Sequence, residues 1–110
     1  MRRVVITGMG VVSSIGNDAA EVLASLREAK SGIDFAPEQA EHGFRSQVSG
    51  RPKLNWEEKV DRRASRFLAE GTGWGHIAME QAIADSGLEE SEISHERTGV
   101  IVGSGGPSTR

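Results

Sequence analysis

The stretch that decides the fold class is Val4-Val-Ile-Thr-Gly-Met-Gly-Val-Val-Ser-Ser-Ile-Gly16. Its first four residues are all β-branched and show no polar alternation, which is the pattern of a strand covered on both faces. A second run of this kind, Thr98–Val102, leads into the glycine-rich segment Gly103–Gly106. Apolar strands that alternate with helices indicate an α/β protein with a largely parallel sheet. Because two or three strands do not make a stable covered sheet, we expect further strands beyond residue 110.

The first helix is predicted from its capping residues. Asn17 or Asp18 can cap it, and Asp18 followed by Glu21 has capping-box spacing. The helix should run over about 19–30 and end at Ser31-Gly32, with glycine taking a left-handed φ. Its buried stripe is expected to consist of three aliphatic residues, Val22, Leu23 and Leu26.

A long helical tract is predicted over about 61–86, with Gly87 as its end. Its apolar residues recur at helical spacing: Phe67, Trp74, Ile77, Ala78, Ala82 and Ile83. Gly71, Gly73 and Gly75 interrupt it, and each costs about 1 kcal/mol relative to alanine. Either another element packs very closely there, or the helix breaks into two. The polar segment 33–55 is irregular, with a short strand possible near Ser46–Ser49.

Composition excludes several classes of function. The net charge of −3 gives no general basic surface for nucleic acid. The absence of cysteine excludes disulfides, thiolate metal sites and thiol chemistry within these residues. No apolar run approaches the roughly 20 residues of a membrane span, so a cytoplasmic protein is expected. With 36 % hydrophobic and 5 % aromatic residues, the apolar material is thin, and the chain should depend on surfaces it does not carry itself.

The early glycines follow a strand and precede a helix, as in loops that bind phosphate. The spacing nevertheless fails the dinucleotide pattern, because position 13 is Ser13, and no lysine near Gly16 completes a P-loop. We therefore expect the glycines to serve close packing of strand on helix.

No catalytic or metal-binding pattern is found among the other polar residues. The three histidines lack metal-pair spacing; His42 and His95 are predicted at the surface, and His76 as a packed or hydrogen-bonded core residue. Ser104 fails the nucleophile-elbow pattern because position 102 is Val102. Trp56 and Trp74 are expected to be packing residues.

The main charged feature is Asp61-Arg-Arg-Ala-Ser-Arg66, in which Arg62 and Arg66 share one helix face and Arg63 lies beside them. Guanidinium groups near a helix start oppose the macrodipole, which suggests a purpose beyond solubility. Arginine forks bind carboxylates and phosphates bidentately, so an acidic partner is the natural interpretation. The alternative is a solvated face compensated by the acidic residues nearby, Asp61, Glu57 and Glu58.

Four segments together resemble the start of the β-ketoacyl-acyl carrier protein synthases, most closely the synthase I branch: Arg3–Gly16, Glu21–Arg27, Ser31–Ile33 and Gln81–Leu88. Thr98–Gly106 fits the same family, so the resemblance spans essentially the whole chain, about a quarter of a family member. It implies a thiolase-like fold, α/β and layered, of which residues 1–110 are the first part of the N-terminal half, without an internal boundary. It also implies a cytoplasmic homodimer that elongates fatty acids by decarboxylating Claisen condensation of acyl and malonyl groups on acyl carrier protein.

The resemblance implies two sites and no cofactor or metal. The carrier-protein docking patch of the family matches Arg62, Arg63 and Arg66, and the loop bordering the acyl pocket matches Gly105, Gly106 and Pro107. Family members usually have glycine where this chain has Pro107, so a changed pocket is expected. The catalytic cysteine and histidines of the family lie beyond residue 110, so we expect the isolated chain to be inactive.

Two alternatives remain open from the sequence. One is a synthase homologue that lacks the nucleophile, such as a polyketide chain-length factor. The other is a non-catalytic module that only binds acyl carrier protein, which would require these residues to fold alone.

Overall fold

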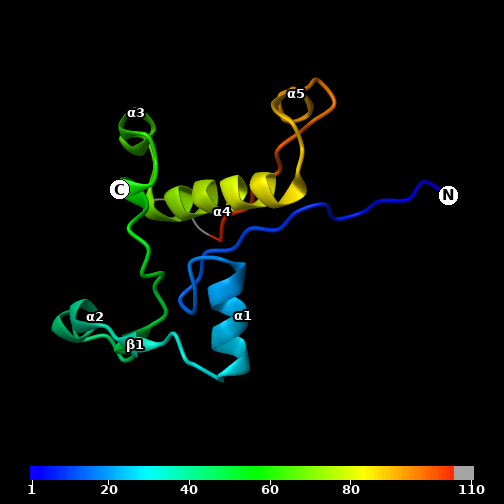
Figure 1. The fold of residues 1–110 in the computed structure, drawn as a ribbon. Coiled ribbons are helices and arrows are strands. Elements are labelled where there is room, and N and C mark those ends of the chain that lie inside the picture. The colour runs from blue at the N-terminus through cyan, green and yellow to red at the C-terminus, as the bar shows by residue number, and fades with distance from the viewer. Residues whose placement is uncertain (106–110) are drawn as a thin grey trace. The chain divides into compact units, whose positions relative to one another are not determined.

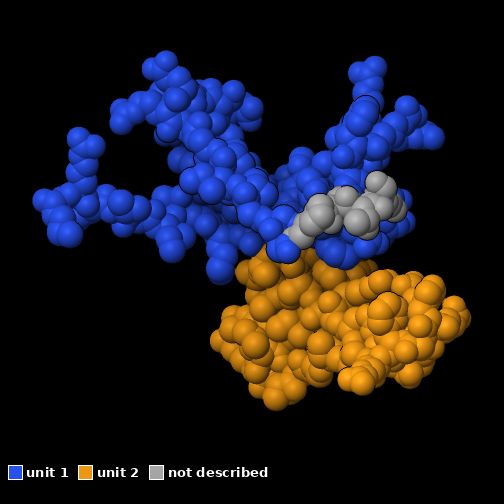
Figure 2. All heavy atoms as spheres, turned by 180° about the vertical axis from the view of Figure 1, so that it is seen from behind, with its two compact units in different colours: residues 1–10, 55–110 blue, residues 11–54 orange. Residues whose placement is uncertain are grey.

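The computed structural model describes residues 1–105, which form two compact units (Figure 2). Unit 1 contains residues 1–10 and the chain from residue 55 on, and unit 2 contains residues 11–54. The elements along the chain (Figure 1) are α1 Ala19–Arg27, β1 Asp34–Phe35, α2 Pro37–Glu41, β2 Val48–Ser49, the 3₁₀ turn η1 Trp56–Glu58, α3 Arg62–Ser65, α4 Glu70–Ser86 and α5 Glu90–Ile93.

Helix α1 begins as its capping residues predict. Asp18 is the N-cap, and its Oδ1 accepts a hydrogen bond from the backbone N–H of Glu21 at 2.9 Å. The Glu21 carboxylate reaches back one residue further than a regular capping box and accepts from the N–H of Asn17 at 2.8 Å.

The end and the buried face of α1 differ from the prediction. The helix ends with Ala29 in the left-handed region, φ 52°, and the expected stop at Ser31-Gly32 was wrong. Leu23 and Leu26 are 47 % and 64 % exposed, so the expected aliphatic stripe is not buried. The buried residue is Ser25, whose hydroxyl donates to the carbonyl of Ile15 at 2.6 Å. A hydrogen bond to the preceding loop, rather than apolar contact, therefore fixes this face of α1.

The short strand expected near Ser46–Ser49 is confirmed as β2. It pairs antiparallel with β1, with Asp34 opposite Ser49 and Phe35 opposite Val48. Unit 2 is thus held by this ladder and by α1 with its capping loop.

The long helical tract is divided, but not at its glycines, and of the two explanations for them close packing holds, at Gly73 alone. Residues 66–69 separate α3 from α4, so the break precedes the glycines. Gly73 lies against the Trp56 ring, whereas a Cβ at Gly71 or Gly75 would meet nothing within 4 Å. Gly87, at φ 67°, ends α4 as predicted. Phe67, expected on the buried face, is 89 % exposed because it lies in the break.

The N-terminal glycines pack closely on α4, which confirms the predicted close packing on a helix, although the segment that packs there is not a strand. A Cβ at Gly8 would lie less than 3.0 Å from backbone atoms of Ser86. A Cβ at Gly10 would lie less than 3.0 Å from backbone atoms of Ala78. The Met9 N–H between them donates to Asp85 Oδ2 at 3.0 Å. The extended chain can therefore cross α4 only because these two positions carry no side chain.

The two predicted apolar strands do not form in the described residues. Val4, Val5 and Ile6 are 76–93 % exposed, and Val100, Ile101 and Val102 are 70–100 % exposed. A strand needs a neighbouring backbone for its ladder, and residues 1–105 place none beside either segment. The only sheet of the described chain is the antiparallel pair of β1 and β2, so the expected parallel sheet is not seen there.

Candidate functional site

The three arginines are brought together on one capped helical turn. We call Arg62, Arg63 and Arg66 the arginine patch; the first two begin α3, and Arg66 is its C-cap. Asp61 is the N-cap, and its Oδ1 accepts from the N–H groups of Arg63 at 2.8 Å and Ala64 at 3.3 Å. The Asp61 carboxylate thus supplies the negative charge that a helix start favours and offsets the unfavourable arginines there.

The guanidinium groups of the patch are exposed and unpaired within the described chain. None of them has a carboxylate oxygen within 4.0 Å; the salt bridges of residues 1–105 join other residues, Arg51 to Glu38, Lys53 to Asp34 and His76 to Glu80. Of the acidic residues expected to compensate the patch, Asp61 caps α3, and Glu58 Oε1 accepts from Asn55 Nδ2 at 2.8 Å. The Asp61 and Glu58 carboxylates are therefore engaged with other donors, and within residues 1–105 the guanidinium groups of the patch make no salt bridge.

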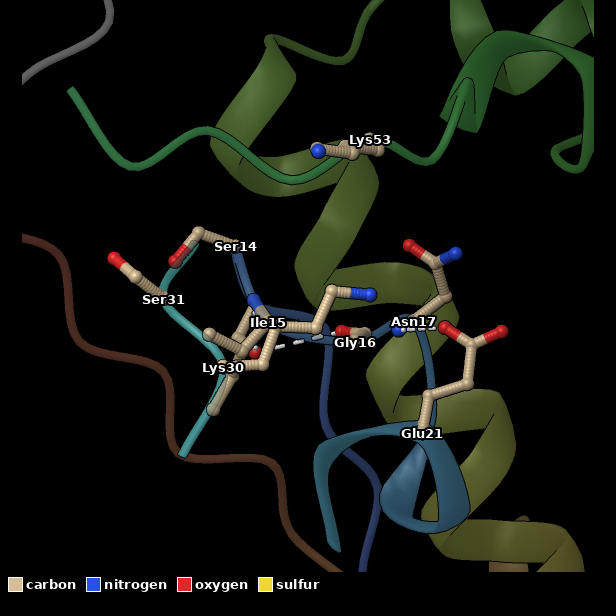
Figure 3. A pocket seen from close by; sticks show the side chains of 9 residues that line it. Ser14, Ile15, Gly16, Asn17, Glu21, Lys30, Ser31 and Lys53 are labelled. Atoms are coloured by element: carbon tan, nitrogen blue, oxygen red, sulfur yellow. Dashed lines mark hydrogen bonds between the residues drawn. The ribbon is translucent and has the colours of Figure 1, made fainter. Parts of the chain in front are cut away.

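A small polar pocket in unit 2 was not anticipated from the sequence (Figure 3). Its volume is about 110 Å³, and its lining consists of loop 13–17, Glu21, Lys30, Ser31 and Lys53. Two of its charged side chains already have partners. Glu21 accepts a hydrogen bond from the N–H of Asn17, and Lys53 Nζ lies 3.2 Å from Asp34 Oδ2. The polar groups that line the pocket are therefore engaged in local contacts. They do not converge on a position where a ligand could bind.

The predicted acyl-pocket loop falls only partly within the described residues. Gly105 is exposed, and a Cβ there would meet nothing within 4 Å. Gly106 and Pro107 lie outside the described residues.

The histidines do not form a site in the described chain. His76, expected in the core, is exposed on α4 with its Nε2 3.4 Å from Glu80 Oε1, because it lies to one side of the buried strip that Gly73 and Ile77 form along the helix. No group of three potential metal ligands occurs in residues 1–105. In the same residues no helix has the length and apolar character needed to cross a bilayer.

Comparison with known proteins places the whole chain in one group. The family described as "Beta-ketoacyl synthase, N-terminal domain" matches residues 1–109. The chain is 49 % identical over 105 residues to 3-oxoacyl-[acyl-carrier-protein] synthase 1 of Haemophilus influenzae, covering 96 % of this chain and 26 % of the relative. It is 50 % identical over 111 residues to the enzyme of the same name from Escherichia coli K12, covering 100 % and 27 %.

A more distant relative carries a related name. The chain is 32 % identical over 105 residues to 3-oxoacyl-[acyl-carrier-protein] synthase 2 of Staphylococcus aureus strain COL, covering 94 % of this chain and 25 % of the relative. The chain thus spans about a quarter of the length of the curated relatives it matches.

Proposed function

Because the chain belongs to the β-ketoacyl synthase family, matching its N-terminal domain, we propose that it is the carrier-docking part of a 3-oxoacyl-[acyl-carrier-protein] synthase. The whole enzyme would be a cytoplasmic homodimer with a layered thiolase-like fold. It would extend fatty acids by decarboxylating condensation of an acyl group with malonyl-carrier protein, without a cofactor. The chain contains no cysteine, so a nucleophilic thiolate would have to come from outside these 110 residues.

The observation that carries this proposal is the arginine patch. Its arginines are exposed, have no carboxylate within salt-bridge distance among residues 1–105, and stand on a turn capped by Asp61. A guanidinium group can donate two parallel hydrogen bonds to one carboxylate. An acyl carrier protein would present such carboxylates on an acidic helix. Because the chain as a whole carries a net charge of −3, attraction of an acidic partner would depend on this local cluster.

The test is charge reversal in a full-length synthase that contains this sequence. Arg62→Glu with Arg66→Glu replaces two attractions by two repulsions. If this costs about 2 kcal/mol of docking, the KM for a carrier-linked substrate should rise about 30-fold. Condensation of a small non-carrier thioester should change little, because that substrate makes no contact with the patch.

A matched control is available at two other exposed arginines, Arg45 and Arg97. Arg45→Glu with Arg97→Glu makes the same change in net charge away from the patch, and it should leave the KM for the carrier-linked substrate within about threefold of wild type. Equal loss with both kinds of substrate in the patch variant would mean that the arginines support the fold. Equal effects of the two double variants would mean that net charge, not this site, attracts the carrier.

A further inference from the structure

The chain that leads into the arginine patch contacts α4 through the ring of Trp56. Trp56, the first residue of η1, is only 4 % exposed. Its indole occupies the place where any residue other than glycine at position 73 would put its Cβ, since that atom would lie inside 3.0 Å of three atoms of the indole. Gly73 is itself buried in α4. With tryptophan at position 56, position 73 therefore has to be glycine.

The segment before the patch contains most of the buried apolar residues of the described chain. The buried apolar residues of the described chain are Trp56, Val60 and Ile77, at 4 %, 7 % and 8 % exposure. Two of them precede the patch in the sequence: Val60 is the residue before Asp61, and Trp56 lies four residues before Val60. On the other side of α3, Phe67 is 89 % exposed and provides no anchor.

Helix α3 cannot set its own orientation. It has four residues, fewer than the number at which an isolated helix becomes stable, so its position depends on what its ends are attached to. Upstream, the chain connects α3 through its N-cap Asp61 and the buried Val60 to Trp56. The ring of Trp56 in turn lies against Gly73 of α4.

We propose that Trp56 and Gly73 are positioning residues for carrier docking: the indole seated on Gly73 sets where α3 presents its guanidinium groups. The inference rests on the proposed function of the arginine patch. Bidentate contacts to carboxylates need fixed donor geometry, so a displaced α3 would lose docking strength while the charges remain.

The experiment compares three identical substitutions along α4 in the full-length synthase. Gly73→Ala forces the indole away, whereas Gly71→Ala and Gly75→Ala add the same methyl group into open space. The quantity measured is the ratio of the KM for a carrier-linked acyl substrate to the KM for a small non-carrier thioester. Gly73→Ala should raise this ratio about fivefold, a docking loss of about 1 kcal/mol, and the two controls should stay within about twofold of wild type.

A second variant tests the contact itself. Trp56→Leu in the Gly73→Ala background replaces the ring with a side chain that can make room for the methyl group, so the ratio should return toward the wild-type value. Such non-additivity is the mark of residues in direct contact.

The outcomes separate this inference from the proposal on which it rests. If Arg62→Glu with Arg66→Glu raises the ratio and Gly73→Ala does not, the positioning role is wrong and carrier docking by the patch stands. If neither change raises it, docking by the patch is wrong, and the positioning role with it. An equal rise in both KM values for Gly73→Ala, or the same ratio for Gly71→Ala as for Gly73→Ala, would also overturn the positioning role.

Discussion

Ala29 holds a left-handed backbone conformation at the end of α1, and Ala29→Gly should stabilise that end. The φ of Ala29 is 52°, a region in which the alanine Cβ crowds the backbone. The conformation is kept because two backbone hydrogen bonds close the helix: Lys30 N–H donates to the Ser25 carbonyl at 2.8 Å, and Ala29 N–H donates to the Leu26 carbonyl at 3.3 Å. These are the two bonds of a Schellman motif, in which glycine is the usual left-handed residue.

The size of the effect follows from what the substitution changes. Both hydrogen bonds are made by the backbone, so the glycine variant keeps them and loses only the crowding of the Cβ. After the greater freedom of glycine in the unfolded chain is subtracted, a net gain of about 1 kcal/mol is expected. The matched control is Ala24→Gly, an exposed position inside the same helix, where glycine should cost about 1 kcal/mol.

The assay is amide hydrogen exchange in the full-length synthase, followed at the Lys30 N–H that bonds to Ser25. Where exchange proceeds through local opening of α1, Ala29→Gly should slow it about fivefold and Ala24→Gly should accelerate it by a similar factor. Exchange that is unchanged or faster in Ala29→Gly would refute the argument, because the strain assigned to the left-handed alanine would then be absent.

Two further changes test the cap of the patch and the crossing of α4. Asp61→Ala should destabilise the first turn of α3 by about 1 kcal/mol, seen as faster amide exchange there, whereas Asp61→Asn keeps an oxygen acceptor and should be nearly neutral. Asp61→Asn should also lower the KM for carrier-linked substrate at low salt, because it removes a negative charge beside the patch. If Asp61→Ala and Asp61→Asn accelerated amide exchange in α3 equally, the capping role of Asp61 would be contradicted. Gly10→Ala drives a Cβ into the backbone at Ala78 and should lower the free energy of unfolding by about 2 kcal/mol, measured by urea denaturation. A Gly10→Ala variant as stable as wild type would refute the close crossing.

Features that depend on neighbouring residues were well predicted. The Asp18 cap, the stop at Gly87 and the family relationship follow from short patterns, because capping and left-handed turns are decided within a few residues. The arginine patch was also found from the sequence, since its spacing alone places the three side chains on one turn. The stop of α1 was missed because alanine seldom takes a left-handed φ, so Ala29 carries no pattern by which it could be recognised.

Features that depend on contacts between residues far apart in the sequence could be seen only in the tertiary structure. Leu23 and Leu26 have helical periodicity, yet only packing decides burial, and the structure buries Ser25 instead. From the sequence, Gly73 was expected only to lower the stability of the helix relative to alanine. That the Trp56 ring lies against Gly73 is visible only in the structure.

The sequence by itself determined the family, the location of the three arginines and the C-terminal end of α4. The tertiary structure alone decided that the patch has no ion-pair partner within the described chain, that the Trp56 ring lies on Gly73 and that Val4–Thr7 stays outside any ladder of the described residues. The physical reason is that caps and turns are satisfied by backbone groups a few residues away. Strand pairing, burial and charge compensation instead require groups that only the folded arrangement brings together.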